Sequence, residues 1–131
     1  MKNNKRGSVV ANEAELQGHE LDTAYLLAKE LGVIIEPIPK SNIKGVHTPD
    51  IMMLGEKWEM KSPTGDGKWL INKRFHEALH QSPNVIFDLR RMKMSEERAI
   101  RELKKEFKLA KAAKRLLIVT KKQKIIDINK K

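Results

Sequence analysis

Residues 49–62 read Pro-Asp-Ile-Met-Met-Leu-Gly-Glu-Lys-Trp-Glu-Met-Lys-Ser, two apolar-rich runs separated by the Gly-Glu dipeptide at 55–56. A two-residue link that begins with glycine is typical of a type II′ turn, so the stretch predicts a β-hairpin. If this turn sets the register, Asp50 lies opposite Lys61 on the second strand. The rest of the fold is expected to form around this hairpin.

Three charged side chains fall on one face of the predicted hairpin. Side chains alternate along a strand, which places Asp50, Glu59 and Lys61 together. The opposite face is apolar and consists of Ile51, Met53, Trp58 and Met60. Two carboxylates can hold a hard divalent cation, and a neighbouring ammonium can orient water or stabilise developing negative charge. The alternative from spacing alone is a salt bridge between Asp50 and Lys61 on a solvated sheet face.

The composition bounds the class of protein. The chain has 131 residues, which suits one domain with a core of a few layers. Apolar residues make up 40% and charged residues 34%, and no apolar run approaches the roughly 20 residues that span a bilayer. Cysteine is absent, which excludes disulfides and cysteine-ligated zinc. The 27 Lys and Arg against 17 Asp and Glu give a net charge of +10, which favours a polyanionic partner such as nucleic acid.

Hydrophobic periodicity and turn residues predict the remaining elements. A helix is expected from about Asn12 to Leu31, ended by Gly32. The other expected elements are a strand at 33–36, a loop at 40–48, a helix at 70–82, a strand at 84–89, a helix that begins after Ser95, and strands at 115–120 and 124–128. We therefore predict a single α/β domain over residues 13–131, with a mixed central β-sheet flanked by helices, preceded by a flexible leader at 1–12.

The pair Pro49-Asp50 followed by Glu59-x-Lys61 resembles the signature of the PD-(D/E)xK nuclease superfamily. The order of the expected elements, αβββαβ, is also that of the restriction-endonuclease-like core of this superfamily, here with an extra helix and C-terminal strands. The resemblance implies a nuclease in which Asp50 and Glu59 bind Mg²⁺ or another divalent cation. Lys61 would position the attacking water or neutralise the transition state.

The same resemblance implies two further site residues on the flanking helices. Glu20 lies on the apolar stripe of the first helix, where a carboxylate is costly unless it is paired or bound to a cation. We match Glu20 to the acidic residue by which the first helix often joins the metal site; Glu13 and Asp22 are rival positions, and a solvated Glu20 is the alternative. Gln81, at the end of the second helix, matches a glutamine that reaches the active site in many of these nucleases.

More narrowly, residues 21–126 resemble the C-terminal tRNase toxin domains of contact-dependent growth inhibition effectors of the CdiA type. The likeness rests on a helix running into Leu31-Gly32, on Pro49-Asp50, Leu54-Gly55 and Glu59-Met60-Lys61-Ser62, on a helix ending in Gln81, on Val85-Ile86-Phe87-Asp88-Leu89, and on the closing strands. It implies that tRNA is the substrate and that a cognate immunity protein binds the domain. It also implies that the domain belongs to a larger secreted or cell-surface effector and is delivered to the cytoplasm of a target bacterium. Only this likeness selects RNA over DNA.

Candidate contacts to the nucleic acid come from three segments. They are Ser62, Thr64 and Lys68 in the loop after the hairpin, Arg74 on the second helix, and Lys105 and Lys108 on the basic side of the third helix. Loops at strand ends that flank a site commonly contact substrate. For the third helix, a solvated charged face is the alternative interpretation.

Three other functions remain open from the sequence. The first is a DNA endonuclease of the same superfamily. The second is a metal-independent ribonuclease toxin that uses histidines as acid and base, with His47, His76 and His80 as the candidates. The third is a nucleic-acid-binding module without catalysis, in which Asp50 and Lys61 form a structural pair.

Overall fold

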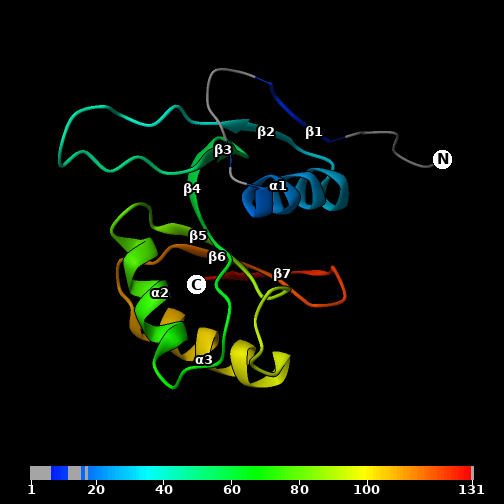
Figure 1. Cartoon of the computed structure of the whole chain (residues 1–131), viewed down its shortest axis with the longest axis vertical. Coiled ribbons are helices and arrows are strands. Elements are labelled where there is room, and N and C mark those ends of the chain that lie inside the picture. The colour runs from blue at the N-terminus through cyan, green and yellow to red at the C-terminus, as the bar shows by residue number, and fades with distance from the viewer. Residues whose placement is uncertain (1–6, 12–15, 17, 131) are drawn as a thin grey trace.

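The computed structural model describes residues 7–11, 16 and 18–130. Its elements are β1 Ser8–Val9, α1 Gly18–Leu31, β2 Ile34–Pro37, β3 Ile51–Met53, β4 Glu56–Lys61, α2 Leu70–Leu79, β5 Asn84–Asp88, α3 Glu96–Leu109, β6 Arg115–Val119 and β7 Ile125–Asn129. In Figure 1 the strands β5, β6 and β7 lie between α1 on one side and α2 with α3 on the other. The segment 1–12, expected to be a flexible leader, contains a short strand: Ser8 and Val9 pair in parallel with β2.

The strands form one seven-stranded sheet in the order β1-β2-β3-β4-β5-β6-β7. Strands β4, β5 and β6 are mutually parallel, whereas β2, β3 and β4 run antiparallel and β7 is antiparallel to β6. The sheet is therefore mixed, and the predicted α/β fold class is confirmed. The run α1-β2-β3-β4-α2-β5 has the expected element order, followed by α3 and the two closing strands.

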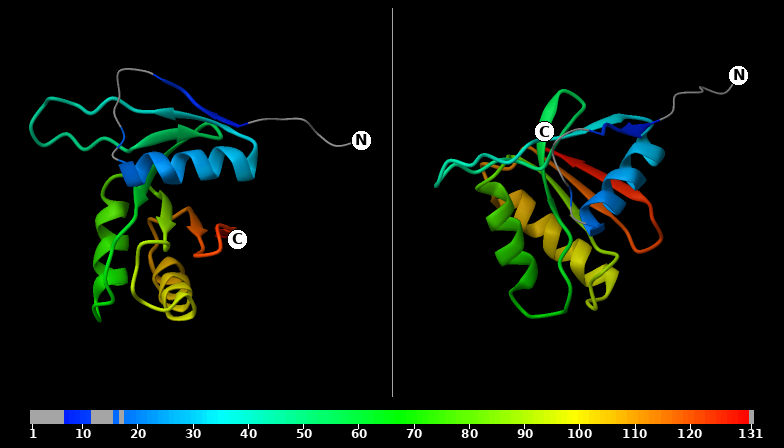
Figure 2. Two further views of the ribbon diagram at one scale, coloured as in Figure 1. Left: turned by 45° about the vertical axis from the view of Figure 1, so that its right-hand side comes forward. Right: turned by 45° about the horizontal axis from the view of Figure 1, so that its top comes forward.

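Each face of the sheet carries its own core. Along β5 the side chains alternate, so that Val85 and Phe87 pack with α2 and α3 while Ile86 packs with the layer under α1. Trp58 and Met60 of β4 belong to the layer under α1. The two views of Figure 2 show the same division of the helices between the two faces. The central part of β4, which carries Glu59, is thus fixed by packing.

The hairpin turn differs from the sequence expectation. Met53 pairs with Glu56, so the two-residue loop is Leu54-Gly55 and not Gly55-Glu56. Both loop residues have positive φ, 56° and 76°, which makes the turn type I′ and matches the twist of the strands. In this register Asp50 lies opposite Glu59 rather than opposite Lys61. The pairing moves by two residues, so every side chain stays on the predicted face.

The predicted helix ends are confirmed in two cases. The first helix ends at Leu31, and Gly32 adopts the left-handed conformation with φ 64°. Ser95 caps α3, because its side chain accepts a hydrogen bond from the Arg98 backbone N–H. The second helix ends at Leu79, three residues before the expected end. The expected start of the first helix near residue 12 lies outside the described residues.

Candidate active site

Asp50, just before β3, and Glu59 of β4 lie opposite each other on one face of the hairpin. Both side chains are buried, with 4% and 7% of the residue exposed. Asp50 accepts two hydrogen bonds, from the Met60 backbone N–H to Oδ2 at 2.8 Å and from Lys40 Nζ to Oδ1 at 2.7 Å. The turn and the register therefore fix the Asp50 carboxylate, and its charge is balanced by a lysine from the loop before it.

The Glu59 carboxylate has far fewer partners. Its Oε2 lies 3.9 Å from Lys61 Nζ, whereas its buried Oε1 has no hydrogen-bond partner among residues 7–11, 16 and 18–130. Burial raises the pKa of Glu59 to about 8, and the neighbouring Asp50 charge adds to the effect. A buried carboxylate oxygen without a hydrogen-bond partner is costly. A cation beside the pair would remove that cost and favour the ionised form of Glu59.

The unsatisfied carboxylate oxygen of Glu59 makes this pair suited to hold a divalent cation. Mg²⁺ is usually held by one or two carboxylates together with waters and substrate phosphates, so Asp50 and Glu59 provide a sufficient protein contribution. Within the described part of the chain, no three Asp, Glu or His side chains come close enough together to hold a metal ion. The structure therefore does not group Glu20 with the two carboxylates, and its role as a third ligand stays a prediction.

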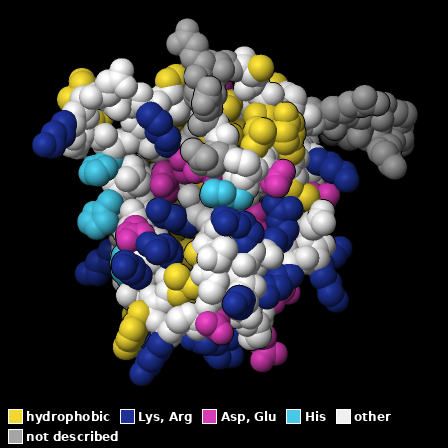
Figure 3. Space-filling model, in the orientation of Figure 1, with side chains coloured by type: hydrophobic (Ala, Val, Ile, Leu, Met, Phe, Trp, Pro, Cys, Tyr) yellow, Lys and Arg dark blue, Asp and Glu magenta, His cyan; other side chains and the backbone are white. Residues whose placement is uncertain are grey.

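Glu20 instead lines a cleft of about 240 Å³ beside the carboxylate pair. The cleft is lined by His19, Glu20, Met60, Lys61, Ser62, Pro63 and Arg74. The cleft thus brings together residues of the first helix, the end of β4 and the second helix. Figure 3 shows Lys and Arg side chains on one face of the molecule with acidic and histidine side chains among them.

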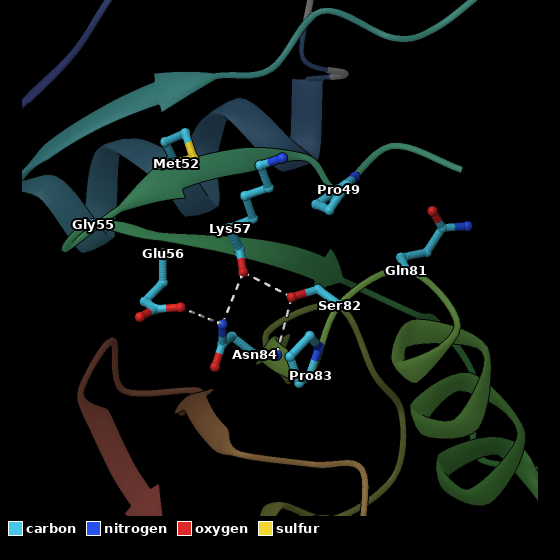
Figure 4. A pocket seen from close by; sticks show the side chains of 9 residues that line it. All are labelled: Pro49, Met52, Gly55, Glu56, Lys57, Gln81, Ser82, Pro83 and Asn84. Atoms are coloured by element: carbon cyan, nitrogen blue, oxygen red, sulfur yellow. Dashed lines mark hydrogen bonds between the residues drawn. The ribbon is translucent and has the colours of Figure 1, made fainter. Parts of the chain in front are cut away.

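Gln81 lies in a different pocket. This pocket, of about 350 Å³, is lined by Pro49, Met52, Gly55, Glu56, Lys57, Gln81, Ser82, Pro83 and Asn84 (Figure 4). Gln81 Nε2 lies 3.3 Å from His47 Nδ1, so the Gln81 side chain contacts the loop before the hairpin. Ser82 and Asn84 both donate to the Lys57 carbonyl and hold the helix end against β4. An active-site role for Gln81 remains a prediction without a contact to support it.

The two remaining candidate histidines, His76 and His80, lie on the side of α2 that faces α3 and the segment after it. His76 Nε2 lies 2.9 Å from Glu106 Oε1 on α3, and Asn72 donates to the same oxygen. His80 lines a pocket with His76 and the segment after α3. These contacts give His76 a part in the packing of α2 against α3.

The expected nucleic-acid contacts separate into two groups. Ser62 and Arg74 line the cleft, and Arg74 also forms an ion pair with Glu77 at 2.8 Å. Thr64, Lys68, Lys105 and Lys108 are exposed. Lys68 lies over the ring of Trp69 at 5.2 Å, at the start of α2. The structure therefore places two of the six candidates beside Lys61.

Lys40 is one of the residues that the sequence interpretation missed. Residues 40–48 were expected to form a polar, basic loop, and nothing in their spacing assigns one lysine to Asp50. In the structure Lys40 Nζ contacts both Asp50 Oδ1 and the Thr48 carbonyl, the latter at 3.2 Å. The signal that could have pointed to such a residue is general: a buried aspartate requires a partner.

The raised pKa of Glu59 predicts how stability depends on pH. In the unfolded chain Glu59 titrates near 4.5, whereas in the folded chain its pKa is about 8. The folded state thus holds the proton more tightly, and stability falls as the pH rises through this window. Glu59→Gln cannot ionise, so without divalent cations it should melt higher than the wild type, by more than about 5 °C at about pH 9. Melting curves at about pH 5 and about pH 9 test this, and parallel pH profiles for the two proteins would contradict it.

Comparison with known proteins agrees with this architecture. Residues 47–125, which include the hairpin and both parallel strands that follow it, match the model of the family described as contact-dependent growth inhibition CdiA C-terminal domain. No curated protein matches the chain. The fold is similar to a solved CdiA-CT/CdiI toxin and immunity complex from Burkholderia pseudomallei, with a TM-score of 0.69 and 13% identity over 95% of this chain and 100% of that one. No described helix is long and apolar enough to cross a membrane. The chain belongs to the CdiA C-terminal domain family of contact-dependent growth inhibition.

Proposed function

We propose that this domain is a metal-dependent ribonuclease toxin that hydrolyses phosphodiester bonds in tRNA. The observation that carries the proposal is the buried Asp50–Glu59 pair, whose Glu59 Oε1 lacks a partner among the described residues, beside the Lys61 ammonium. Family membership supports a role in growth inhibition, and the net charge of +10 supports a polyanionic target.

Asp50 and Glu59 would hold Mg²⁺ or a similar cation, helped by the Met60 backbone carbonyl. The cation, when bound, supplies Lewis-acid stabilisation of charge on the phosphate oxygens and lowers the pKa of bound water. The protein contributes rigidity: the Met60 backbone N–H fixes the Asp50 carboxylate, and β4 fixes Glu59. Such preorganisation is what makes electrostatic stabilisation effective.

Lys61 would act on the scissile phosphate. Its side chain is 25% exposed and opens to the cleft, with Nζ 3.9 Å from Glu59 Oε2. From there the ammonium can orient water or neutralise charge that develops in the transition state. Arg74, on the opposite wall of the cleft, would bind a phosphate of the RNA backbone. Glu20 would complete the acidic side of the cleft.

Incubation of the purified domain with total RNA and with plasmid DNA tests the function. With Mg²⁺ we expect cleavage of tRNA and intact plasmid; with EDTA we expect no cleavage. Cleavage of plasmid would identify a DNA endonuclease. Cleavage of RNA in EDTA would identify a metal-independent ribonuclease, and binding without cleavage would leave only a nucleic-acid-binding module.

Lys40 predicts a measurable competition with the cation. Its ammonium occupies Asp50 Oδ1, the oxygen that a metal ion would approach, although 54% of the Lys40 side chain is exposed. Asp50 is buried but the Lys40 end of the pair is solvated, so we take the roughly 1 kcal/mol of a surface ion pair as the scale, and Lys40→Met should strengthen cation binding by roughly twofold to fivefold. Lys44→Met, in the same loop, is the matched control and should leave cation affinity unchanged. Equal affinities for the Lys40 variant and the wild type would show that the lysine does not compete.

The biological setting follows from the family. We propose that the domain is the effector part of a larger secreted or cell-surface protein and acts in the cytoplasm of a target bacterium. A solved relative in fold is a toxin and immunity complex, which supports a cognate immunity protein as the partner here. We expect that partner to be acidic, because the domain is strongly basic. Expression of the domain with and without the adjacent open reading frame tests this, and growth arrest in both cases would contradict it.

A further inference from the structure

A second pocket adjoins the catalytic cleft. It has a volume of about 190 Å³ and is lined by His19, Asp22, Ser62, Asp88, Arg90 and Arg91. Two of these residues, His19 and Ser62, also line the cleft that holds Lys61. The two hollows are therefore neighbours along one wall, and a nucleotide beside the scissile phosphate can reach the second pocket.

The Arg90 guanidinium in this pocket is held rigidly by Asp88. Asp88 is 2% exposed and accepts from Arg90 Nε and Nη2, at 3.0 Å and 2.8 Å. Thr23 Oγ1 donates to the same carboxylate at 2.6 Å and fixes it against α1. A guanidinium has five N–H donors, so the Nη1 group and one hydrogen of Nη2 remain for a ligand. The pocket thus presents a preorganised pair of donors.

The wall also carries hydrogen-bond acceptors. Asp22 is exposed on α1 and lines the pocket opposite the loop that carries the two arginines. The hydrogen bonds and charge of Asp88 raise the pKa of the Arg90 guanidinium against the opposing effect of burial, and the charge of Asp22 adds a smaller increase. Ser62 has a buried Oγ with no hydrogen-bond partner in the described chain. Unsatisfied buried polar atoms of this kind call for a ligand or an ordered water.

The balance of charge decides what kind of ligand fits. Two arginines face two aspartates, so the pocket has no excess positive charge with which to bind a phosphate. A neutral group that both accepts from arginine and donates to aspartate fits better. Among the bases, guanine offers the O6 and N7 acceptors that arginine contacts in pairs, together with N–H donors on its other edge. Ribonucleases and RNA-binding proteins commonly read unstacked bases in this way.

We propose that this pocket binds a guanine base of the RNA, with Arg90 donating to O6 and N7 and Asp22 accepting from the N1 and N2 hydrogens. The proposal deepens the proposed ribonuclease function, because the base would belong to the nucleotide next to the phosphate in the cleft. Arg91 closes the rim, since its Nη1 donates to the Ser62 carbonyl at 2.8 Å and ties the loop to β4. The pocket would then select where the strand is cut.

Nucleotide binding tests the proposal without cleavage. Without divalent cations, GMP should bind the wild type at least about tenfold more tightly than AMP, CMP or UMP do, since a good bidentate base contact discriminates by about 1–3 kcal/mol. Asp22→Asn should lose this preference and bind GMP about tenfold more weakly. Asp127→Asn, the same change on β7, is the control and should keep the preference.

Inorganic phosphate distinguishes a base pocket from an anion site. If the pocket bound phosphate, removing the Asp22 charge would strengthen binding of inorganic phosphate and of all four nucleotides together. That result, or equal affinity of the wild type for all four nucleotides, would overturn the proposal. Sequencing the ends of cleaved RNA gives a separate reading: the wild type should cut beside guanosine, and the products of Asp22→Asn should lose this bias. Cleavage with no base preference would contradict the guanine pocket but not the ribonuclease function. A preference for GMP without any cleavage would contradict the ribonuclease function but not the guanine pocket.

Discussion

Asp50→Asn and Glu59→Gln are expected to lower the rate of RNA cleavage by at least about a thousandfold while the domain stays folded. Each change removes one of the two buried carboxylates that would hold the cation. Asparagine still offers an oxygen to the Met60 backbone N–H, so Asp50→Asn keeps the hydrogen bond that Asp50 makes there. Glutamine fills the same volume as Glu59 and carries no buried charge.

Two matched variants control this experiment. Glu36→Gln on β2 and Asp127→Asn on β7 make the same chemical changes at exposed positions and should cleave RNA at the wild-type rate. Circular dichroism and thermal melting establish that all four variants are folded. Cleavage at near wild-type rates by both Asp50→Asn and Glu59→Gln would contradict the metal-site proposal.

Lys61→Ala is expected to lower the cleavage rate at saturating RNA by about a hundredfold to ten-thousandfold and to leave RNA affinity nearly unchanged. The ammonium lies beside Glu59 at the edge of the cleft, so its charge would act on the reacting phosphate in the transition state. Lys61→Arg should also fail, because the planar guanidinium does not take the place of a compact ammonium in this partly buried position.

Lys108→Ala provides the contrast with Lys61. Lys108 is exposed on α3, away from the cleft lining, so its removal should weaken binding, flatten the salt dependence and leave the saturated rate intact. Single-turnover cleavage over a range of RNA and salt concentrations separates the two behaviours. If Lys61→Ala lost affinity in step with Lys108→Ala and kept its saturated rate, Lys61 would be a phosphate contact and nothing more.

The two faces of the hairpin were predictable because alternation is a strong constraint. The predicted position of the turn was wrong. Leu54 takes a left-handed conformation that is unusual for leucine, so the sequence pattern favours Gly55 as the first turn residue. A register shift of two residues leaves every side chain on the same face of the hairpin. Asp50, Glu59 and Lys61 consequently stay together although their pairing changed.

Contacts that depend on irregular chain paths were not predictable. Lys40 reaches Asp50 only because residues 40–48 form a long excursion that returns beside its own start, and no periodicity describes such a loop. Gln81 lies two residues beyond Leu79, the last residue of α2, and so lies outside the helix on which the resemblance placed it. Its neighbour in space is His47.

The pairing of Arg90 with Asp88 was missed for another reason. Residues 84–89 were interpreted as a buried strand, and no partner was assigned to Asp88. A buried aspartate at the end of a strand needs a cationic or hydrogen-bonding partner, and an arginine two residues later is an available one. A search for the partner of each buried charged residue would have pointed to the pocket that Asp88 and Arg90 line.

Direct measurement of cation binding to the wild type and to Glu59→Gln tests the proposed site most sharply. Mn²⁺ serves as the probe in isothermal titration calorimetry, because it takes the same carboxylate oxygens as Mg²⁺. The wild type should bind one cation per chain, and Glu59→Gln should bind it at least about tenfold more weakly, while Glu36→Gln should match the wild type. Absence of binding by the wild type, or equal affinity of the wild type and Glu59→Gln, would contradict the assignment of Asp50 and Glu59 as the metal site.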